Sequence, residues 1–297
     1  MSLSIAIPAS TQRPDHLRNA INSVIAQDAA SWTLVVVDDA PGEGRYRELV
    51  ESVGDARVRY LRNDGDHGIG QAWNVCTSAV DGELYAILHA DDELKPNYVR
   101  VMTDLARRFP DGAMYFCGAE IIDDSGERAF SLADFVKWFV QPRGRTIRLA
   151  GESALARLFT GDFIMCPTIV YRKSRLGARR FSTGLRFVLD IALIADVLFA
   201  GEAIYGTSAA AYRYRRHRDA ATAVFNKTGY RFEEEIALHR HVAAQARRRG
   251  FRLAALAANV MLFVRLNLLY CAVTDALSGR WGGFRSKLKL FAQARTS

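Results

Sequence analysis

Three short apolar runs, nearly unbroken by polar residues, constrain the fold of this chain most. They read SIAIP from Ser4, TLVVVDD from Thr33 and LYAILHADD from Leu84. A strand with one face in water alternates apolar and polar residues, so these runs predict strands buried on both faces, as in a parallel sheet. Helix-like segments separate the runs. Such alternation predicts an α/β domain with right-handed crossovers.

The same pattern and the turn residues predict where the elements begin and end. We expect strands over 3–8, 32–39, 57–63, 83–92, 113–122, 168–172 and 203–214. We expect helices over 14–27, 45–53, 69–80, 96–109 and 189–200, with Pro14 and Pro96 suited to a first helical turn. The stretch from about 125 to 184 is less regular, and the chain is helical from Tyr230. It therefore divides into an α/β domain, 1–225, and a C-terminal helical region, 226–297.

The cysteines and the N-terminus indicate a cytoplasmic chain. Four cysteines (Cys76, Cys117, Cys166 and Cys271) lie far apart, without a C-x-x-C pair. This spacing argues against a zinc ribbon, a redox dithiol or a disulfide scaffold, and it fits a reducing compartment. The first residues, MSLSIAIP, lack the basic and long apolar segments of a secretory signal.

The C-terminal region carries most of the net charge of +8. From residue 240 onward, eleven basic residues accompany a single acid, Asp275. Such a segment favours an anionic partner, namely phospholipid, a phosphorylated substrate or nucleic acid; the alternative is a solvated helical face. The apolar stretch 254–277 contains Arg265 near its centre, which disfavours a spanning helix. We expect an amphipathic helix, packed on the α/β domain or lying at a bilayer surface.

Polar residues follow the predicted strands where ligands gather in open α/β sheets. The first strand ends in PAST, the second in Asp38 and Asp39, and the fourth in HADD, which includes Asp91 and Asp92. Paired carboxylates repel each other unless a cation or a donor group satisfies them. Oxygen ligands suit Mg²⁺ or Mn²⁺. The alternative is that Asp38 and Asp91 only cap the helices that follow.

A dinucleotide-binding Rossmann domain does not fit the glycine pattern. Its G-x-G-x-x-G turn would follow the first strand, where this chain has PASTQRP. The glycine cluster at Gly65, Gly68 and Gly70 follows the third strand instead, and Trp73 stands where the last glycine should be.

The order of these motifs resembles glycosyltransferase family 2 over about residues 3–217. The carrying features are Pro8-Ala9 after the first strand, Ser23 to Gln27 in S-x-x-x-Q, Val37-Asp38-Asp39, and Ala90-Asp91-Asp92. The resemblance implies the GT-A fold: a Rossmann-like, mostly parallel sheet flanked by helices, here with a C-terminal helical extension. Residues 1–225 would then bind nucleotide-sugar and acceptor. His89 replaces the usual first acid of D-x-D, and Leu189 replaces a usual glutamate.

The resemblance also implies roles for individual residues. Asp39 would grip the nucleotide base. Asp91, Asp92 and His217, the last residue of the Y-R-x-H-like run AYRYRRH, would hold a divalent metal, Mn²⁺ or Mg²⁺. The nucleotide-sugar would be bound by Pro8, Ala9, Ser10, Arg13, Asp39, Gly68, Asn74 and Asp91.

Asp190 is the candidate general base, because the family places an acidic pair at the start of a helix that ends in glycine. Counting back eleven residues from Gly201 reaches Asp190. The alternative is an acid that only stabilises the helix N-terminus. A positioned carboxylate that removes a proton from a sugar hydroxyl contributes about 10²–10⁴-fold in rate.

The resemblance implies an inverting, metal-dependent hexosyltransferase-like enzyme of cell-surface polysaccharide or glycolipid biosynthesis. It would move a sugar from a nucleotide diphosphate donor to a saccharide or lipid-linked saccharide. We expect it in the cytoplasm, with peripheral contact to the inner face of the membrane through the basic helices. A sugar nucleotidyltransferase is the alternative, although PASTQRP lacks its Gly-rich basic loop. A nucleic-acid-binding protein is a weaker alternative, because no reader motif accompanies the basic residues, and no nucleic-acid partner is expected.

Overall fold

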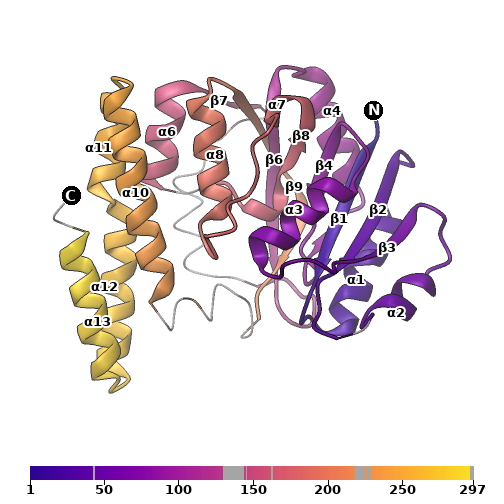
Figure 1. Ribbon diagram of the computed structural model, residues 1–297, viewed down its shortest axis with the longest axis horizontal. Coiled ribbons are helices and arrows are strands. Elements are labelled where there is room, and N and C mark those ends of the chain that lie inside the picture. The colour runs from indigo at the N-terminus through magenta and orange to yellow at the C-terminus, as the bar shows by residue number, and fades with distance from the viewer. Residues whose placement is uncertain are drawn as a thin grey trace.

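A mixed β-sheet with helices on both faces forms the centre of the computed structural model (Figure 1). The structure describes residues 1–42, 44–129, 144, 146–161, 163–217, 225 and 229–294. The strands are β1 Leu3–Ala9, β2 Trp32–Asp38, β3 Val58–Arg62, β4 Leu84–Ile87, β5 Glu93–Leu94, β6 Gly112–Ile122, β7 Ile147–Leu149, β8 Val170–Arg172 and β9 Ala203–Arg215. The helices of the α/β part are α1 Pro14–Ile25, α2 Arg47–Glu51, α3 Ile69–Ala79, α4 Tyr98–Arg108, α6 Gly151–Thr160, α7 Lys173–Leu176 and α8 Leu189–Phe199, with a 3₁₀ turn η1 at Cys166–Thr168.

The strands follow the order β3-β2-β1-β4-β8-β6-β9-β5, and β7 pairs with β9. The first half of this order is parallel, as the apolar runs predict, because β2 pairs with both β3 and β1 and β1 pairs with β4. Beyond β4 the sheet is mixed: β8 is antiparallel to β4 and β6, whereas β6 and β9 are parallel. The carboxyl ends of β1, β2 and β4 therefore meet at one edge, and the end of β9 reaches it from the other half.

The apolar runs are unbroken because each strand faces two hydrophobic cores. In β1, Ile5 and Ile7 pack into one core with α1 and α4, whereas Ala6 between them packs into the other with α3 and α8. In β2, Val36 and Val37 divide in the same way. Successive side chains of a strand point to opposite faces, so most positions are apolar where the sheet is covered on both sides.

Three expectations about element boundaries are wrong. The predicted strand 83–92 ends at Ile87, because Asp92 N–H bonds the His89 carbonyl and closes a turn. Helix α4 begins at Tyr98 rather than in a turn with Pro96, whose carbonyl accepts the Asp28 N–H instead. The less regular stretch contains α6 and β7, which the sequence pattern does not indicate.

The C-terminal helices stand side by side at the end of the sheet farthest from β3 (Figure 1). They are α10 Tyr230–Arg248, α11 Arg252–Val260, α12 Leu262–Leu277 and α13 Trp281–Gln293. Met261, with φ of 48°, separates α11 from α12. Residues Arg252–Leu277 together are long and apolar enough to cross a membrane, yet only 28% of their most apolar 18-residue window is buried. The expected helical region from Tyr230 is confirmed, whereas the boundary at 225 stays a prediction.

Candidate active site

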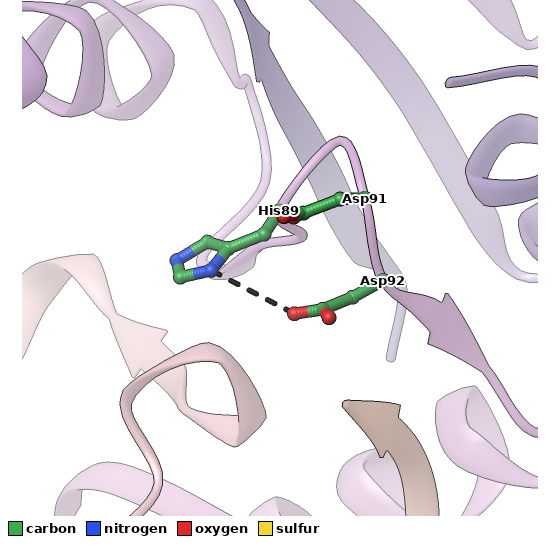
Figure 2. Close-up of side chains that lie close together, drawn as sticks. All are labelled: His89, Asp91 and Asp92. Atoms are coloured by element: carbon green, nitrogen blue, oxygen red, sulfur yellow. Dashed lines mark ion pairs between the residues drawn. The ribbon is translucent and has the colours of Figure 1, made fainter. Parts of the chain in front are cut away.

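The turn after β4 brings two carboxylates and an imidazole together at the carboxyl edge of the sheet. Potential ligand atoms of His89, Asp91 and Asp92 all lie within 4.8 Å of one another (Figure 2). The turn is fixed at both ends: Leu88 N–H bonds the Ala6 carbonyl of β1, and Asp92 N–H bonds the His89 carbonyl. The sequence therefore places both acids in the turn just after β4, at the carboxyl edge of the sheet.

Asp92 serves the fold. Its side chain is 1% exposed and accepts hydrogen bonds from the Tyr212 hydroxyl at 2.9 Å and from Arg215 N–H at 2.7 Å. Burial, followed by the charge of Asp91, raises the pKa of Asp92 well above its usual range. Both oxygens already have partners on β9, so this carboxyl joins the turn to β9.

Asp91 is the more open carboxylate, with 21% of its side chain exposed. Its Oδ2 lies 2.8 Å from Nε2 of His217, which follows the end of β9. Burial acts to raise the pKa of Asp91, but the hydrogen bond from His217 and the charges of His89 and His217 lower it overall. Asp91 is therefore ionised at neutral pH, and the predicted pair of Asp91 and His217 does meet in space.

His89 adds a nitrogen ligand to this group. Its Nδ1 lies 3.6 Å from Asp92 Oδ2, its ring stacks at a tilt on Trp73 with centroids 5.5 Å apart, and its Nε2 is buried without a hydrogen-bond partner. Burial lowers the pKa of His89, which keeps the imidazole in the neutral form that binds metals. Asp91 offers the oxygen ligand that suits Mn²⁺ and Mg²⁺, whereas an imidazole ligand such as His89 suits a transition metal better than Mg²⁺.

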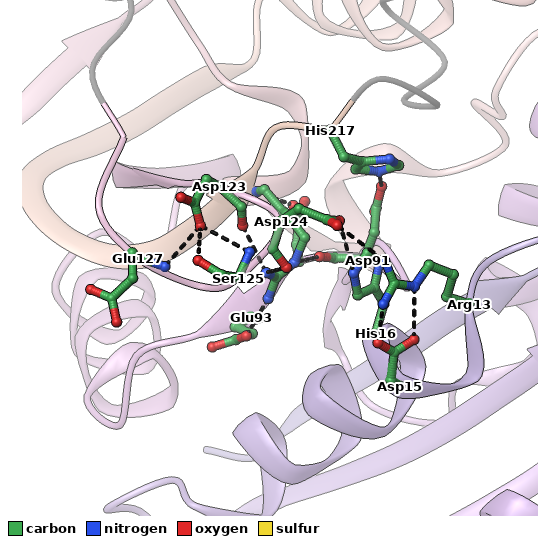
Figure 3. A network of polar contacts seen from close by, with 12 residues as sticks. Arg13, Asp15, His16, Asp91, Glu93, Asp123, Asp124, Ser125, Glu127 and His217 are labelled. Atoms are coloured by element: carbon green, nitrogen blue, oxygen red, sulfur yellow. Dashed lines mark hydrogen bonds and ion pairs between the residues drawn. The ribbon is translucent and has the colours of Figure 1, made fainter.

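A polar network borders Asp91 on the side of α1 (Figure 3). Arg13 is ion-paired with Asp15 at 2.6 Å and with Asp124, from the turn after β6, at 3.0 Å. His16 Nε2 lies 3.2 Å from Asp124, and its ring meets the His217 ring edge-on at 5.6 Å. Burial lowers the pKa of His16. Arg13 was predicted for the nucleotide, whereas His16 and Asp124 carried no motif and were missed.

The two acids after β2 have different surroundings. Asp38 is fully buried and accepts hydrogen bonds from Tyr60 Oη at 2.8 Å and from Tyr46 N–H at 3.2 Å, so it holds the loop that leads into α2. Asp39 accepts from Asn63 Nδ2 at 2.6 Å and lies 2.9 Å from Nδ1 of the exposed His67. Asn63 and His67 were not predicted; the glycine-rich loop that contains them was the available signal.

The end of β1 lies beside Asp39, because Asp39 N–H bonds the Ala9 carbonyl at 2.7 Å. Pro8 and Ala9 close the strand, and Ser10 N–H bonds the Gln12 side chain at 2.7 Å. Gly68 precedes α3 with φ of 132°, a conformation that side chains rarely adopt. The predicted residues Pro8, Ala9, Ser10 and Gly68 thus belong to the same edge of the sheet as Asp39.

Asn74 has a structural task on α3. Its side chain donates to the Phe181 carbonyl at 2.9 Å and accepts from Phe181 N–H at 3.0 Å. One helical turn earlier, Gly70 packs so closely on Ser182 that a β-carbon would collide with the Ser182 carbonyl oxygen. Together they hold the loop after residue 180 against α3. The amide of Asn74 is therefore engaged in this contact rather than turned toward the edge of the sheet.

Asp190 lies in the first turn of α8, half-buried. Burial raises the pKa of Tyr171 on β8, and the charge of Asp190 adds to this rise. The Asp190 carboxylate is therefore near β8, which pairs with β4. Glu234 of α10 fixes the chain just before this helix, accepting backbone N–H groups of Arg186, Phe187 and Val188 at 2.8–3.3 Å. Sequence reasoning missed Glu234, which lies 44 residues from Asp190 in the chain.

This fold, with acidic residues gathered at the carboxyl edge of its parallel half, defines a glycosyltransferase of the GT-A class. The family model described as glycosyl transferase family 2 matches residues 4–173, which is more than half of the chain. The chain belongs to glycosyl transferase family 2. The predicted family and fold class are thereby confirmed.

Similar proteins agree with this membership. The succinoglycan biosynthesis protein ExoO of Rhizobium meliloti is 28% identical over 225 residues, which cover 70% of this chain and 59% of ExoO. The putative colanic acid biosynthesis glycosyl transferase WcaA of Escherichia coli is 30% identical over 100 residues, or 33% of this chain and 36% of WcaA. The chain thus spans less than two thirds of these relatives.

Solved structures of S. aureus TarS share the fold across nearly the whole chain. TarS 1–349 in complex with UDP-GlcNAc matches with a TM-score of 0.64 at 14% identity, over 99% of this chain and 93% of that one. TarS 1–349 in complex with UDP matches with a TM-score of 0.59 at 15% identity. The matched span of 99% of this chain extends over residues of both the α/β part and the C-terminal helices.

Proposed function

We propose that this glycosyltransferase moves a sugar from a nucleotide diphosphate donor to a hydroxyl of a saccharide or lipid-linked saccharide, with inversion at the anomeric carbon. The observation that carries the proposal is the contact of Asp91 with His217 at 2.8 Å, at the edge of the sheet where Asp39 follows β2. Relatives that take part in succinoglycan and colanic acid biosynthesis support a role in cell-surface polysaccharide assembly. This would take place at the cytoplasmic face of the membrane.

The donor would lie along the carboxyl edge of the sheet. Asp39, held by Asn63 and His67, would accept hydrogen bonds from the base, as in the family. The Pro8–Ser10 backbone and Gly68 would let the nucleotide approach closely, because small residues leave room there. TarS, which has the same fold, was solved with UDP-GlcNAc, and this supports a uridine nucleotide as the first donor to test.

Asp91, His217 and His89 would hold a divalent metal ion. Such an ion, when bound, neutralises charge that develops on the leaving diphosphate. Asp92 would hold the turn that carries His89 and Asp91 in place, because its own oxygens accept hydrogen bonds from Tyr212 and Arg215 of β9. Arg13 and His16 lie next to it and would limit how the diphosphate enters.

Asp190 would act as the general base. The acceptor oxygen attacks the anomeric carbon, the bond from that carbon to the diphosphate oxygen breaks, and Asp190 takes the hydroxyl proton. Attack opposite the leaving group inverts the anomeric configuration. Glu234 holds the backbone before α8, so it would fix where this carboxylate stands.

The first experiment measures thermal stability with UDP, GDP, CDP and TDP, each with and without Mn²⁺. We expect a metal-dependent shift of several degrees with one base, and loss of that shift in Asp39→Ala. The nucleotide-sugar of that base is then incubated with saccharide acceptors, and NMR of the product reads the anomeric configuration. A folded protein that binds none of the nucleotides, or a product that retains configuration, would contradict the proposal.

A further inference from the structure

One face of α11 and α12 presents large apolar side chains to solvent. They recur at helical spacing, three or four residues apart within each helix, so those of each helix share one face of it. Figure 1 shows the two helices at the end of the molecule farthest from β3. Leu277 is 85% exposed and Tyr270 is 68% exposed. The stripe consists of Leu253, Leu256, Leu266, Tyr270, Val273 and Leu277. Six large apolar side chains exposed on two successive helices are more than the singly scattered ones of an ordinary surface, which indicates an interaction site.

The opposite face of the same helices is committed to the protein. Ala254, Ala255 and Ala258 of α11 are buried in the core that includes α6, and Val264 and Leu268 of α12 pack with α10 and α13. Arg265, in the middle of the stretch, donates to the carbonyl of Ala294, the residue after α13, at 2.6 Å. If α11 and α12 crossed a membrane, they would lose these contacts with α6, α10 and α13. If they bound along the membrane surface, they would keep them.

Exposed cations stand at both ends of the stripe. Arg247, Arg248 and Arg252 are exposed where α10 meets α11, and Arg280 and Arg285 are exposed where α12 meets α13. Asp275, the single acid after Glu235, is buried against Lys287 and Arg280. The stripe therefore lies between two positive ends, and the carboxylate that touches it, Glu152, is bonded to the Leu253 N–H at 2.5 Å.

This charge pattern decides which partner covers the stripe. Two copies packed stripe to stripe would set the arginines of one against the arginines of the other, whichever way round they meet. The headgroups of an anionic lipid surface would pair with the arginines at both ends of the stripe, and its acyl region would bury the apolar side chains between them. Trp281, 60% exposed just beyond α12, is the type of residue that prefers the boundary between headgroups and acyl chains.

We infer that the exposed apolar face of α11 and α12 is a docking surface for anionic phospholipid. The two helices would lie along the bilayer surface, in the plane of the membrane. The inference extends the proposed membrane-linked function, since it names the surface that meets the lipid. It does not depend on sugar transfer, because lipid binding is measured without donor or acceptor. The vesicle experiment therefore tests lipid binding alone, and the nucleotide and product experiments test sugar transfer alone.

The test is flotation of the full chain with vesicles of phosphatidylcholine alone and of phosphatidylcholine mixed equally with phosphatidylglycerol. We expect binding to the mixed vesicles only, and release by high salt. Combined Arg248→Gln, Arg252→Gln and Arg285→Gln should weaken binding by roughly a hundredfold, because each surface cation adds to the attraction. Combined Leu256→Gln, Leu266→Gln and Val273→Gln should weaken it at least about tenfold.

Matched controls lie on the far side of the molecule. Arg18→Gln on α1 and Leu61→Gln on β3 change an exposed cation and an exposed leucine and should leave vesicle binding unchanged. All variants should bind nucleotide as the parent does. The inference is wrong if the parent ignores the mixed vesicles or if neither set of changes weakens binding. It is also wrong if alkaline carbonate fails to release the chain, or if the leucine set only splits a dimer.

Discussion

The carboxylate of Glu234 on α10 accepts the backbone N–H of Phe187 at 2.8 Å, two residues before α8 begins. The neighbouring amides of Arg186 and Val188 bond the same carboxylate. The C-terminal region thus fixes the start of the helix that carries Asp190, across the boundary expected at residue 225. The two parts of the chain are coupled at the point where the proposed base stands.

Glu234→Ala should therefore lower both stability and turnover. Removing the carboxylate leaves three amides without their partner, which should cost about 2–3 kcal/mol of unfolding free energy. We expect kcat to fall while nucleotide binding stays unchanged, since Asp39 and Asp91 lie elsewhere. Urea denaturation and steady-state kinetics measure the two effects. Glu233→Ala, an exposed neighbour in the same turn, is the control; equal losses in both variants would rule out the positioning role.

Asp91 and Asp92 should respond differently to the same substitution. Asp91→Asn should abolish the Mn²⁺-dependent part of nucleotide binding and lower activity by about two to three orders of magnitude. Asp92→Asn should keep metal-dependent binding, because its carbonyl oxygen can still accept from Arg215 N–H and its amide can reach Tyr212. Thermal shifts with UDP and Mn²⁺ compare the two. Loss of the metal effect in Asp92→Asn alone would reverse the assignment.

Asp190→Asn should slow the reaction without weakening the donor complex. A lost general base lowers kcat by about 10²–10⁴-fold. The neutral side chain keeps the size of the original, so the helix should fold as before. Asp196→Asn, on the same helix, is the control and should leave kcat unchanged. A near-normal kcat in Asp190→Asn would mean that this carboxylate only stabilises the helix N-terminus.

Acid should destabilise the fold as the pH falls below 6.5. Burial lowers the pKa of His239, whose Nδ1 lies 2.9 Å from the Ala258 carbonyl and joins α10 to α11. The unfolded chain then binds a proton that the folded chain resists, so stability is lost as pH decreases below the ordinary histidine value of 6.5. His239→Asn preserves a donor and removes the titration. Its melting temperature should depend less on pH than that of the parent; an identical dependence would exclude His239 as a cause.

Gly70→Ala should destabilise the protein although alanine favours helices. A β-carbon at Gly70 collides with the Ser182 carbonyl, so the loop after residue 180 must move away from α3. The matched control is Gly282→Ala in α13, where a β-carbon meets nothing within 4 Å. That change should stabilise by about 0.5–1 kcal/mol. Thermal unfolding of both variants measures the two effects. Stabilisation at both positions would show that the loop after residue 180 moves away from α3 without a cost in stability.

The sequence predicted the parts of this fold that depend on local pattern. The runs around Ile5 and Val36 are apolar throughout because both faces of their strands are covered, and this leaves a signal in the sequence itself. Acids placed at the ends of such strands, Asp39 and Asp91, must then gather at one edge. The meeting of Asp91 with His217 was therefore predictable once the motif order was seen.

Contacts between distant segments were not predictable in this way. Nothing in HADD distinguishes the buried Asp92 from the open Asp91; the difference arises from Tyr212, which is 120 residues later. His16 and Asp124 meet because α1 and the turn after β6 border the same edge, and neither stands in a motif. Asn74 fits the family pattern, yet its amide is held by Phe181, which only the packing of α3 reveals.

The long separation between Asp92 and its partners has a consequence for synthesis. Tyr212 and the Arg215 amide leave the ribosome 120 and 123 residues after Asp92 does. Until β9 emerges and inserts beside β6, the carboxyl of Asp92 can only be satisfied by water, so the turn after β4 stays hydrated. A nascent chain that stalls before residue 203 thus lacks β9, which supplies the partners of Asp92 and leads to His217. The proposed site is therefore completed late in translation, although its acids are made early.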